Sequence, residues 1–159
     1  LHDLSACGVS IIQMDRDLDH GPILTQQTVD LYEQPIPGLE LDTTLARISG
    51  CLLVDVMQKL PTDTIAPVEQ DHAAATFCGK ITKDMSELHI DPAHLPTGDE
   101  ALEIYRKICA FDGWPETFFI HNGKRIKIKS ARLTEAGVLE LLRVVPEGKN
   151  EISWEQFQF

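Results

Sequence analysis

The chain has 159 residues and a net charge of −11, with 43% hydrophobic and 25% charged residues. This composition excludes a disordered chain, and no apolar run approaches the roughly 18 to 20 residues of a membrane helix. The strongly acidic surface disfavours a protein that coats nucleic acid generally. The charge is uneven, because residues 1–98 carry −10 and residues 99–159 carry −1, which favours two domains with different partners.

The first part of the chain predicts two strands, an acidic loop and a long helix. β-branched and apolar residues predict strands over 8–14 and 23–29, and the Gly-Pro-terminated segment 15–21 between them is a loop. Apolar residues then recur at three- and four-residue steps, which predicts a helix that is capped by Asp42 or Thr43 and ends near Leu60.

Residues 61–98 are punctuated by prolines and show no long periodic run, so they predict an extended linker with one short ordered piece near residues 78–83. Thr97 and Glu100 have the spacing of a capping box, and a helix with one apolar face follows them. That helix opens the second ordered part of the chain.

A hairpin is the clearest signal in the C-terminal part. Asn122-Gly123 is the preferred pair for a type I′ turn, and it predicts that residue 121 lies opposite 124, 120 opposite 125 and 119 opposite 126. A further strand over 138–145 and a second capping box, Ser153 with Gln156, complete the chain. Several strands and helices in about 60 residues favour a small barrel.

A metal site is not supported. The four cysteines contain no CxxC pair, so they are expected to be reduced thiols of a cytosolic protein. Asp15, Asp17 and Asp19 resemble the start of a calcium loop, but His20 and Gln26 stand where such a loop needs Gly and Glu.

The acidic loop after the first strand is the first candidate site. A carboxylate at the end of a strand can hold a histidine in its useful tautomer and stabilise its protonated form. The alternative, which spacing alone favours, is a solvated acidic turn.

Several segments together resemble the folate-dependent formyltransferases and, within them, the methionyl-tRNA formyltransferase family. The resemblance is carried by Gly8–Asp15, Leu18–Leu24, Ala101–Phe111, Trp114-Pro115, Asn122–Ile128, Pro146–Lys149 and Ser153-Trp154. These segments follow the order of the family and span essentially the whole chain.

The resemblance implies transfer of a formyl group from 10-formyltetrahydrofolate to the amine of methionyl-initiator tRNA. It implies the end of a Rossmann-like α/β catalytic domain over 1–66, a linker over 67–91 and an OB-like, tRNA-binding barrel over 92–159. Because the chain starts with Leu and reaches a strand pattern at once, we expect a piece of a longer protein that lacks the catalytic Asn and His. The piece alone is predicted to be inactive.

Within the family, the residue that matches Asp19 supports the catalytic histidine as it accepts the proton of the amine. The folate pocket of the family uses the loop that holds this residue. The implied pocket residues are Met14, Asp15, Leu18, Asp19, His20 and Gly21. His20 stands where many members have Thr, and its ring would contact the pterin or point to solvent.

The second candidate site is a basic strand face. Strand alternation places Arg125, Lys127 and Lys129 on one side, each roughly 7 Å from the next, which is comparable to phosphate spacing. An ordinary solvated strand face is the alternative. The barrel of the family contacts tRNA, and Lys149 is expected to join these three residues.

Two other functions remain open: a related formyltransferase or formyl-folate hydrolase that acts on a small molecule, and a non-catalytic RNA-binding module. The expected setting is a cytoplasmic protein with no metal and no membrane contact, monomeric when complete, whose partners are initiator methionyl-tRNA and the folate co-substrate.

Overall fold

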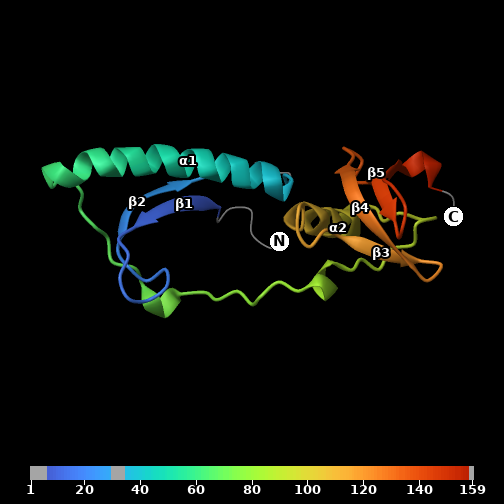
Figure 1. Ribbon diagram of the computed structural model, residues 1–159, viewed down its shortest axis with the longest axis horizontal. Coiled ribbons are helices and arrows are strands. Elements are labelled where there is room, and N and C mark those ends of the chain that lie inside the picture. Colours follow the sequence, from blue (N-terminus) through green and yellow to red (C-terminus); the bar gives the residue numbers. More distant parts are fainter. Residues whose placement is uncertain (1–6, 30–34, 158–159) are drawn as a thin grey trace. The chain divides into compact units, whose positions relative to one another are not determined.

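The computed structural model describes residues 7–29 and 35–157, which form two compact units (Figure 1). Among the described residues, the first unit comprises residues 7–29 and 40–79, and the second unit comprises residues 35–39 and 80–157. Each unit mixes helices with antiparallel strands, and no helix among the described residues is long and apolar enough to cross a membrane.

Two strands flank the acidic loop in the first unit. β1 (Gly8–Ile12) and β2 (Ile23–Thr28) pair antiparallel, with Gly8 opposite Thr28, and the register shifts between Ile11 and Ile12. Both strands were predicted. Their pairing brings the two ends of the 15–21 loop together.

The long helix α1 (Gly38–Lys59) begins four residues before Asp42, the first of the two predicted cap residues. The prediction was wrong because the helix start uses an acceptor distant in sequence: the backbone N–H of Leu39 donates to the Asp112 carboxylate at 3.2 Å. A local capping pattern contains no sign of such a partner. At its other end α1 continues into the 3₁₀ turn Leu60–Thr62.

The predicted linker holds two short 3₁₀ helices, His72–Ala74 and Lys83–Ser86. The short ordered piece predicted near residues 78–83 lies further along the chain, since residues 78–82 have no regular secondary structure and the 3₁₀ helix begins at Lys83. This segment still pairs with strands in each unit, because Val68 bridges Ile23 and Glu87 bridges Phe118. These pairings depend on distant strands rather than on local periodicity.

The second unit contains one helix and a four-stranded antiparallel sheet in the order β3-β4-β5-β6. Its elements are α2 (Gly98–Ala110), β3 (Phe118–His121), β4 (Lys124–Leu133), β5 (Leu139–Pro146), β6 (Ile152–Ser153) and the 3₁₀ helix Trp154–Gln156. The apolar face of α2 packs on the sheet over a core that includes Ala101, Phe119 and Leu139, each 0% exposed.

The predicted hairpin register is confirmed residue by residue. Asn122 and Gly123 have φ values of 50° and 72°, as a type I′ turn requires. The second capping box is also confirmed, since the Ser153 N–H donates to Gln156 at 3.2 Å.

The first capping box is not formed. Thr97 is the N-cap residue of α2, but its side chain makes no capping hydrogen bond. The backbone supplies the partner instead, because the N–H of Gly98 donates to the carbonyl of Gly137 at 2.7 Å.

Candidate functional site

The loop between β1 and β2 is built on a close backbone crossing. The Gln13 N–H donates to the Pro22 carbonyl at 2.9 Å, so the loop closes on itself. A Cβ at buried Gly21 would lie 1.7 Å from the Gln13 carbonyl oxygen, and therefore only glycine fits there. Between these points Asp19 adopts a left-handed φ of 55°, which turns the chain sharply at that residue.

His20 is held by two partners rather than pointing freely to solvent. Its Nδ1 lies 2.6 Å from Asp15 Oδ2, and its ring stacks on that of His72 at 3.7 Å with an interplanar angle of 5°. The hydrogen bond to Asp15 raises the pKa of His20, and the same bond lowers the pKa of Asp15. Nothing in the sequence indicated these two contacts, and contact of the ring with a pterin stays a prediction.

A second segment of the chain, residues 68–72, is hydrogen-bonded to the loop and to the start of β2. Gln70 Nε2 donates to the carbonyl of Asp19 at 2.9 Å and to that of Gly21 at 2.6 Å. Two residues earlier, Val68 exchanges backbone hydrogen bonds with Ile23 at 2.8 and 2.9 Å. The conformation of the loop is thus fixed from a segment that the sequence marked only as linker.

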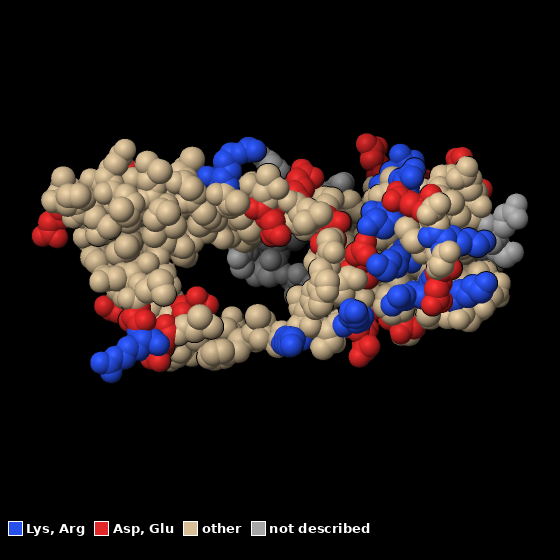
Figure 2. All heavy atoms as spheres, in the orientation of Figure 1, with Lys and Arg blue, Asp and Glu red and all other residues tan. Residues whose placement is uncertain are grey.

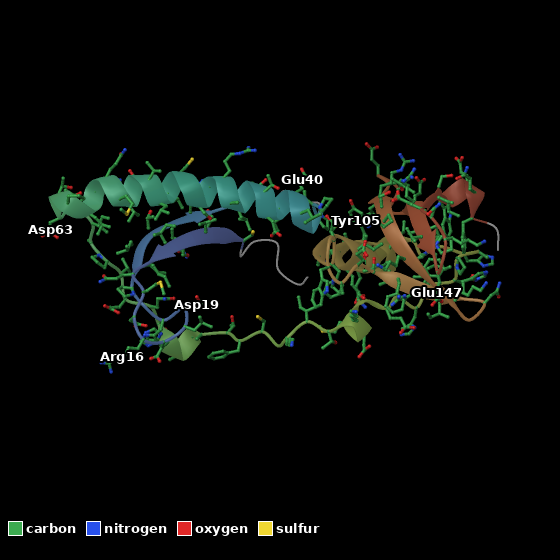
Figure 3. The ribbon with its side chains drawn as sticks, viewed as in Figure 1. Arg16, Asp19, Glu40, Asp63, Tyr105 and Glu147 are labelled. Atoms are coloured by element: carbon green, nitrogen blue, oxygen red, sulfur yellow. The ribbon has the colours of Figure 1, made fainter. Side chains whose placement is uncertain are left out.

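The remaining predicted pocket residues lie on the open side of the loop. Met14 is 87% exposed and Leu18 is 93% exposed, so both apolar side chains are available to a ligand. Asp15 is occupied, because its other oxygen accepts the N–H of Asp17 at 2.9 Å. Figure 3 shows Asp19 on this loop, with the side chain of Arg16 extending away from it.

Within residues 7–29 and 35–157 no group of three or more His, Cys, Asp or Glu side chains is placed to hold a metal ion. Cys109 is buried, and burial raises the pKa of its thiol to about 11. The thiol is therefore protonated at neutral pH.

Lys and Arg gather over the second unit, intermixed with acidic side chains (Figure 2). Arg125 stacks over the Phe118 ring at 5.6 Å, and its backbone N–H donates to Glu147 at 3.2 Å. Lys149 is exposed, and its backbone N–H donates to the Pro146 carbonyl in a turn. Arg125 and Lys149 therefore keep their cationic groups accessible.

The two central cations of the predicted basic face share one carboxylate. Lys127 Nζ donates to Glu116 Oε2 at 2.6 Å, and Lys129 Nζ donates to Glu116 Oε1. Burial opposes ionisation of Glu116, but the hydrogen bonds from the two lysines outweigh it and lower its pKa. Glu116 in turn raises the pKa of Lys129. An ionised Glu116 thus cancels one of the two positive charges on this face.

Sequence reasoning missed three residues of these sites: Gln70, His72 and Glu116. The first two lie in the predicted linker, and Glu116 lies in the turn after α2 with a φ of 65°. No local pattern marks them, since each acts on residues 11 to 52 positions away.

Residues 98–137 match the family described as the C-terminal domain of formyl transferases. The methionyl-tRNA formyltransferase of Dehalococcoides mccartyi is 34% identical over 131 residues, which cover 82% of this chain and 39% of that protein. The one of Treponema pallidum is 30% identical over 175 residues, which cover 94% of this chain and 52% of that protein. The chain thus spans about half or less of the length of these relatives.

Solved structures agree at the level of the fold. The methionyl-tRNA formyltransferase from Clostridium thermocellum matches with a TM-score of 0.56 at 22% identity, covering 92% of this chain and 56% of that one. HypX from Aquifex aeolicus, crystallised with tetrahydrofolic acid, matches with a TM-score of 0.60 at 13% identity, over 94% of this chain and 29% of that one. The sugar 3N-formyl transferase WlaRD matches with a TM-score of 0.61 at 15% identity, over 94% and 57%. Together with the sequence relatives, these matches confirm the predicted resemblance over most of the chain.

Proposed function

Because the chain is related to the methionyl-tRNA formyltransferases, we propose that the protein transfers a formyl group from 10-formyltetrahydrofolate to the amino group of methionyl-initiator tRNA. The observation that carries the proposal is the loop over residues 14–21: the segment that resembles the family is closed, turned at Asp19 and strapped by Gln70. In this proposal residues 1–66 complete a Rossmann-like domain, 67–91 link it, and 92–159 form an OB-like domain.

Asp19 is the residue we propose for catalysis. The amine attacks the formyl carbon and forms a new C–N bond, and it loses a proton to the catalytic histidine. The bond from the formyl carbon to the folate nitrogen breaks, and that nitrogen gains a proton as tetrahydrofolate leaves. A carboxylate that supports the proton-accepting histidine stabilises the charge that develops on its ring. The resemblance assigns that histidine and its partner Asn to positions outside this chain.

The folate co-substrate is proposed to bind along the same loop. Exposed Met14 and Leu18 offer apolar surface to a flat ring system, and the backbone around Asp15, His20 and Gly21 offers polar groups beside it. Small-molecule sites combine such apolar contacts with a few fixed polar groups. Structures related in fold have been solved with tetrahydrofolic acid and with 5-N-formyl-THF, which supports a folate here.

Initiator tRNA is the proposed partner of the second unit, through Arg125, Lys127, Lys129 and Lys149. Arg125 and Lys149 are exposed, whereas the two central lysines are shared with Glu116. Phosphates that approach this face compete with Glu116 for both ammonium groups. We place the protein in the cytoplasm, as a monomer when complete.

A related reaction on a small molecule is the second candidate. It is favoured by the match to a sugar 3N-formyl transferase, which covers 94% of this chain. To distinguish the acceptors, the protein at its full natural length is incubated with labelled formyl-folate in three separate reactions. The acceptor is methionyl-tRNA in the first, an amino-sugar nucleotide in the second and water in the third. Label in the tRNA alone supports the proposed function, and label in the sugar alone or in free formate contradicts it.

The role of Asp19 is tested in the protein at its full natural length. Asp19→Asn is expected to lower the turnover of formyl transfer by about a hundredfold or more, while tRNA affinity stays unchanged. Asp17→Asn is the matched control, because it removes the same charge from an exposed position of the same loop. Near-normal turnover in Asp19→Asn would remove Asp19 from the mechanism.

A further inference from the structure

The side-chain amide of Gln70 donates hydrogen bonds to two backbone carbonyls of the 15–21 loop. Its Nε2 carries two hydrogens, and two carbonyl oxygens accept from it: that of Asp19 at 2.9 Å and that of Gly21 at 2.6 Å. Both distances are those of good N–H···O bonds. The two carbonyls flank His20, so one amide pins the backbone on both sides of that residue.

The segment that carries Gln70 is itself anchored to the loop at both ends. Val68 pairs with Ile23 through two backbone hydrogen bonds, and His72 stacks on His20. Gln70 lies between these anchors and is half-buried. The backbone that carries the Gln70 amide is therefore held in place next to the loop by these contacts.

The geometry matters most at Asp19. A left-handed φ of 55° is uncommon for a non-glycine residue, so contacts around Asp19 must favour it. The bond from Gln70 fixes the Asp19 carbonyl, which lies across the Cα–C bond from that φ, and so restrains the ψ torsion of Asp19. With the backbone of Asp19 restrained, the direction of its Cα–Cβ bond, and hence of its carboxylate, is set.

We propose that Gln70 is a positioning residue for formyl transfer, which holds the Asp19 carboxylate in its working direction by fixing the carbonyls of Asp19 and Gly21. This inference rests on the proposed function and assigns a role to a residue of the linker. Misplacement of a reacting group by about 1 Å can lower a rate by about a hundredfold. Loss of the two Gln70 hydrogen bonds should therefore lower turnover and leave tRNA binding unchanged.

The test uses Gln70→Glu and Gln70→Ala in the protein at its full natural length. Gln70→Glu keeps the size of the side chain but removes both donor hydrogens and places a carboxylate against two carbonyl oxygens. Gln70→Ala removes the bonds without adding charge. The matched control is Gln58→Glu, which makes the same chemical change at an exposed position of α1.

Three measurements define the result. Both Gln70 variants are expected to lower kcat at least tenfold with the KM for tRNA within about twofold, while Gln58→Glu has no effect. In an Asp19→Asn background, Gln70→Ala should cause no further loss of kcat, because the group that it positions is already disabled. Amide hydrogen exchange at residues 19–21 should speed up in the Gln70 variants alone.

Unchanged kcat in both Gln70 variants overturns the inference, as does a full additional loss of kcat in the Asp19→Asn background. A rise in both KM values with normal kcat also overturns it, because it would assign Gln70 to binding. A wild-type protein that formylates no methionyl-tRNA contradicts the proposed function itself. Faster exchange at residues 19–21 would in that case still establish that Gln70 holds the loop.

Discussion

If the second unit binds RNA as proposed, replacement of Glu116 by Gln is expected to strengthen that binding. Glu116 is ionised at neutral pH and lies between Lys127 and Lys129, so it cancels one of their two charges. Glu116→Gln keeps the shape of the side chain and makes one more net positive charge available to phosphate.

The magnitude follows from counterion release. Each additional phosphate contact steepens the dependence of log K on log salt by about 0.7–0.9, which at about 0.1 M salt corresponds to roughly five- to eightfold tighter binding. The loss of stability should be small, at most about 1 kcal/mol, because the Lys127 and Lys129 side chains are 37% and 38% exposed. Affinity for initiator tRNA is measured over a range of salt concentrations.

Glu135→Gln is the control, because Glu135 is exposed in the turn before β5 and makes the same change in net charge. It should alter affinity and salt slope much less than Glu116→Gln does. Equal effects of the two variants, or an unchanged slope in Glu116→Gln, would refute the idea that phosphate and Glu116 compete for these lysines.

Two further predictions concern stability and pH. Phe119→Ala should lower the free energy of unfolding by about 3–5 kcal/mol in denaturant titrations, because Phe119 is 0% exposed in the core. The control Phe77→Ala, at a 94% exposed position, should change the free energy of unfolding by less than about 0.5 kcal/mol. Equal losses in the two variants would contradict the core assignment. An NMR titration should give His20 a pKa above its ordinary 6.5. Asp15→Asn should return that pKa toward 6.5, since the hydrogen bond to Asp15 is the main cause of the shift. An unshifted pKa in the wild-type protein would contradict the hydrogen bond between His20 and Asp15. Because the pKa of His20 is raised in the folded protein, protonated His20 stabilises the loop below pH 6.5, and this stabilisation is lost as the pH rises through the pKa of His20 in the folded state. Because the pKa of Asp15 is lowered, ionised Asp15 stabilises the loop above pH 3.8, and this stabilisation is lost as the pH falls through the pKa of Asp15 in the folded state. The pair therefore contributes most between pH 3.8 and pH 6.5.

Local chemistry made the hairpin predictable. Asn122 and Gly123 accept positive φ, a two-residue turn allows one register, and that register places Phe119 and Ile126 together in the core. The strands beside the acidic loop were predictable for the same reason, because their apolar and β-branched residues are contiguous in sequence.

The start of α1 was not predictable, because the acceptor for its Leu39 N–H is Asp112, 73 residues away. The candidate sites divide in the same way. Motif and order placed Asp19 in a loop after a strand and the cations on one strand face, but they gave no sign of what holds either group.

The sequence by itself determined which residue types stand at each turn, strand and loop, and the order of motifs that relates the chain to formyl transferases. Only the tertiary structure decided that Gln70 bonds both sides of His20, that His72 stacks on its ring and that Glu116 draws together Lys127 and Lys129. The physical reason is range. Turn geometry and hydrophobic periodicity act over a few residues and can be seen in order along the chain, whereas a hydrogen bond or ion pair joins whatever groups the fold brings within about 3 Å.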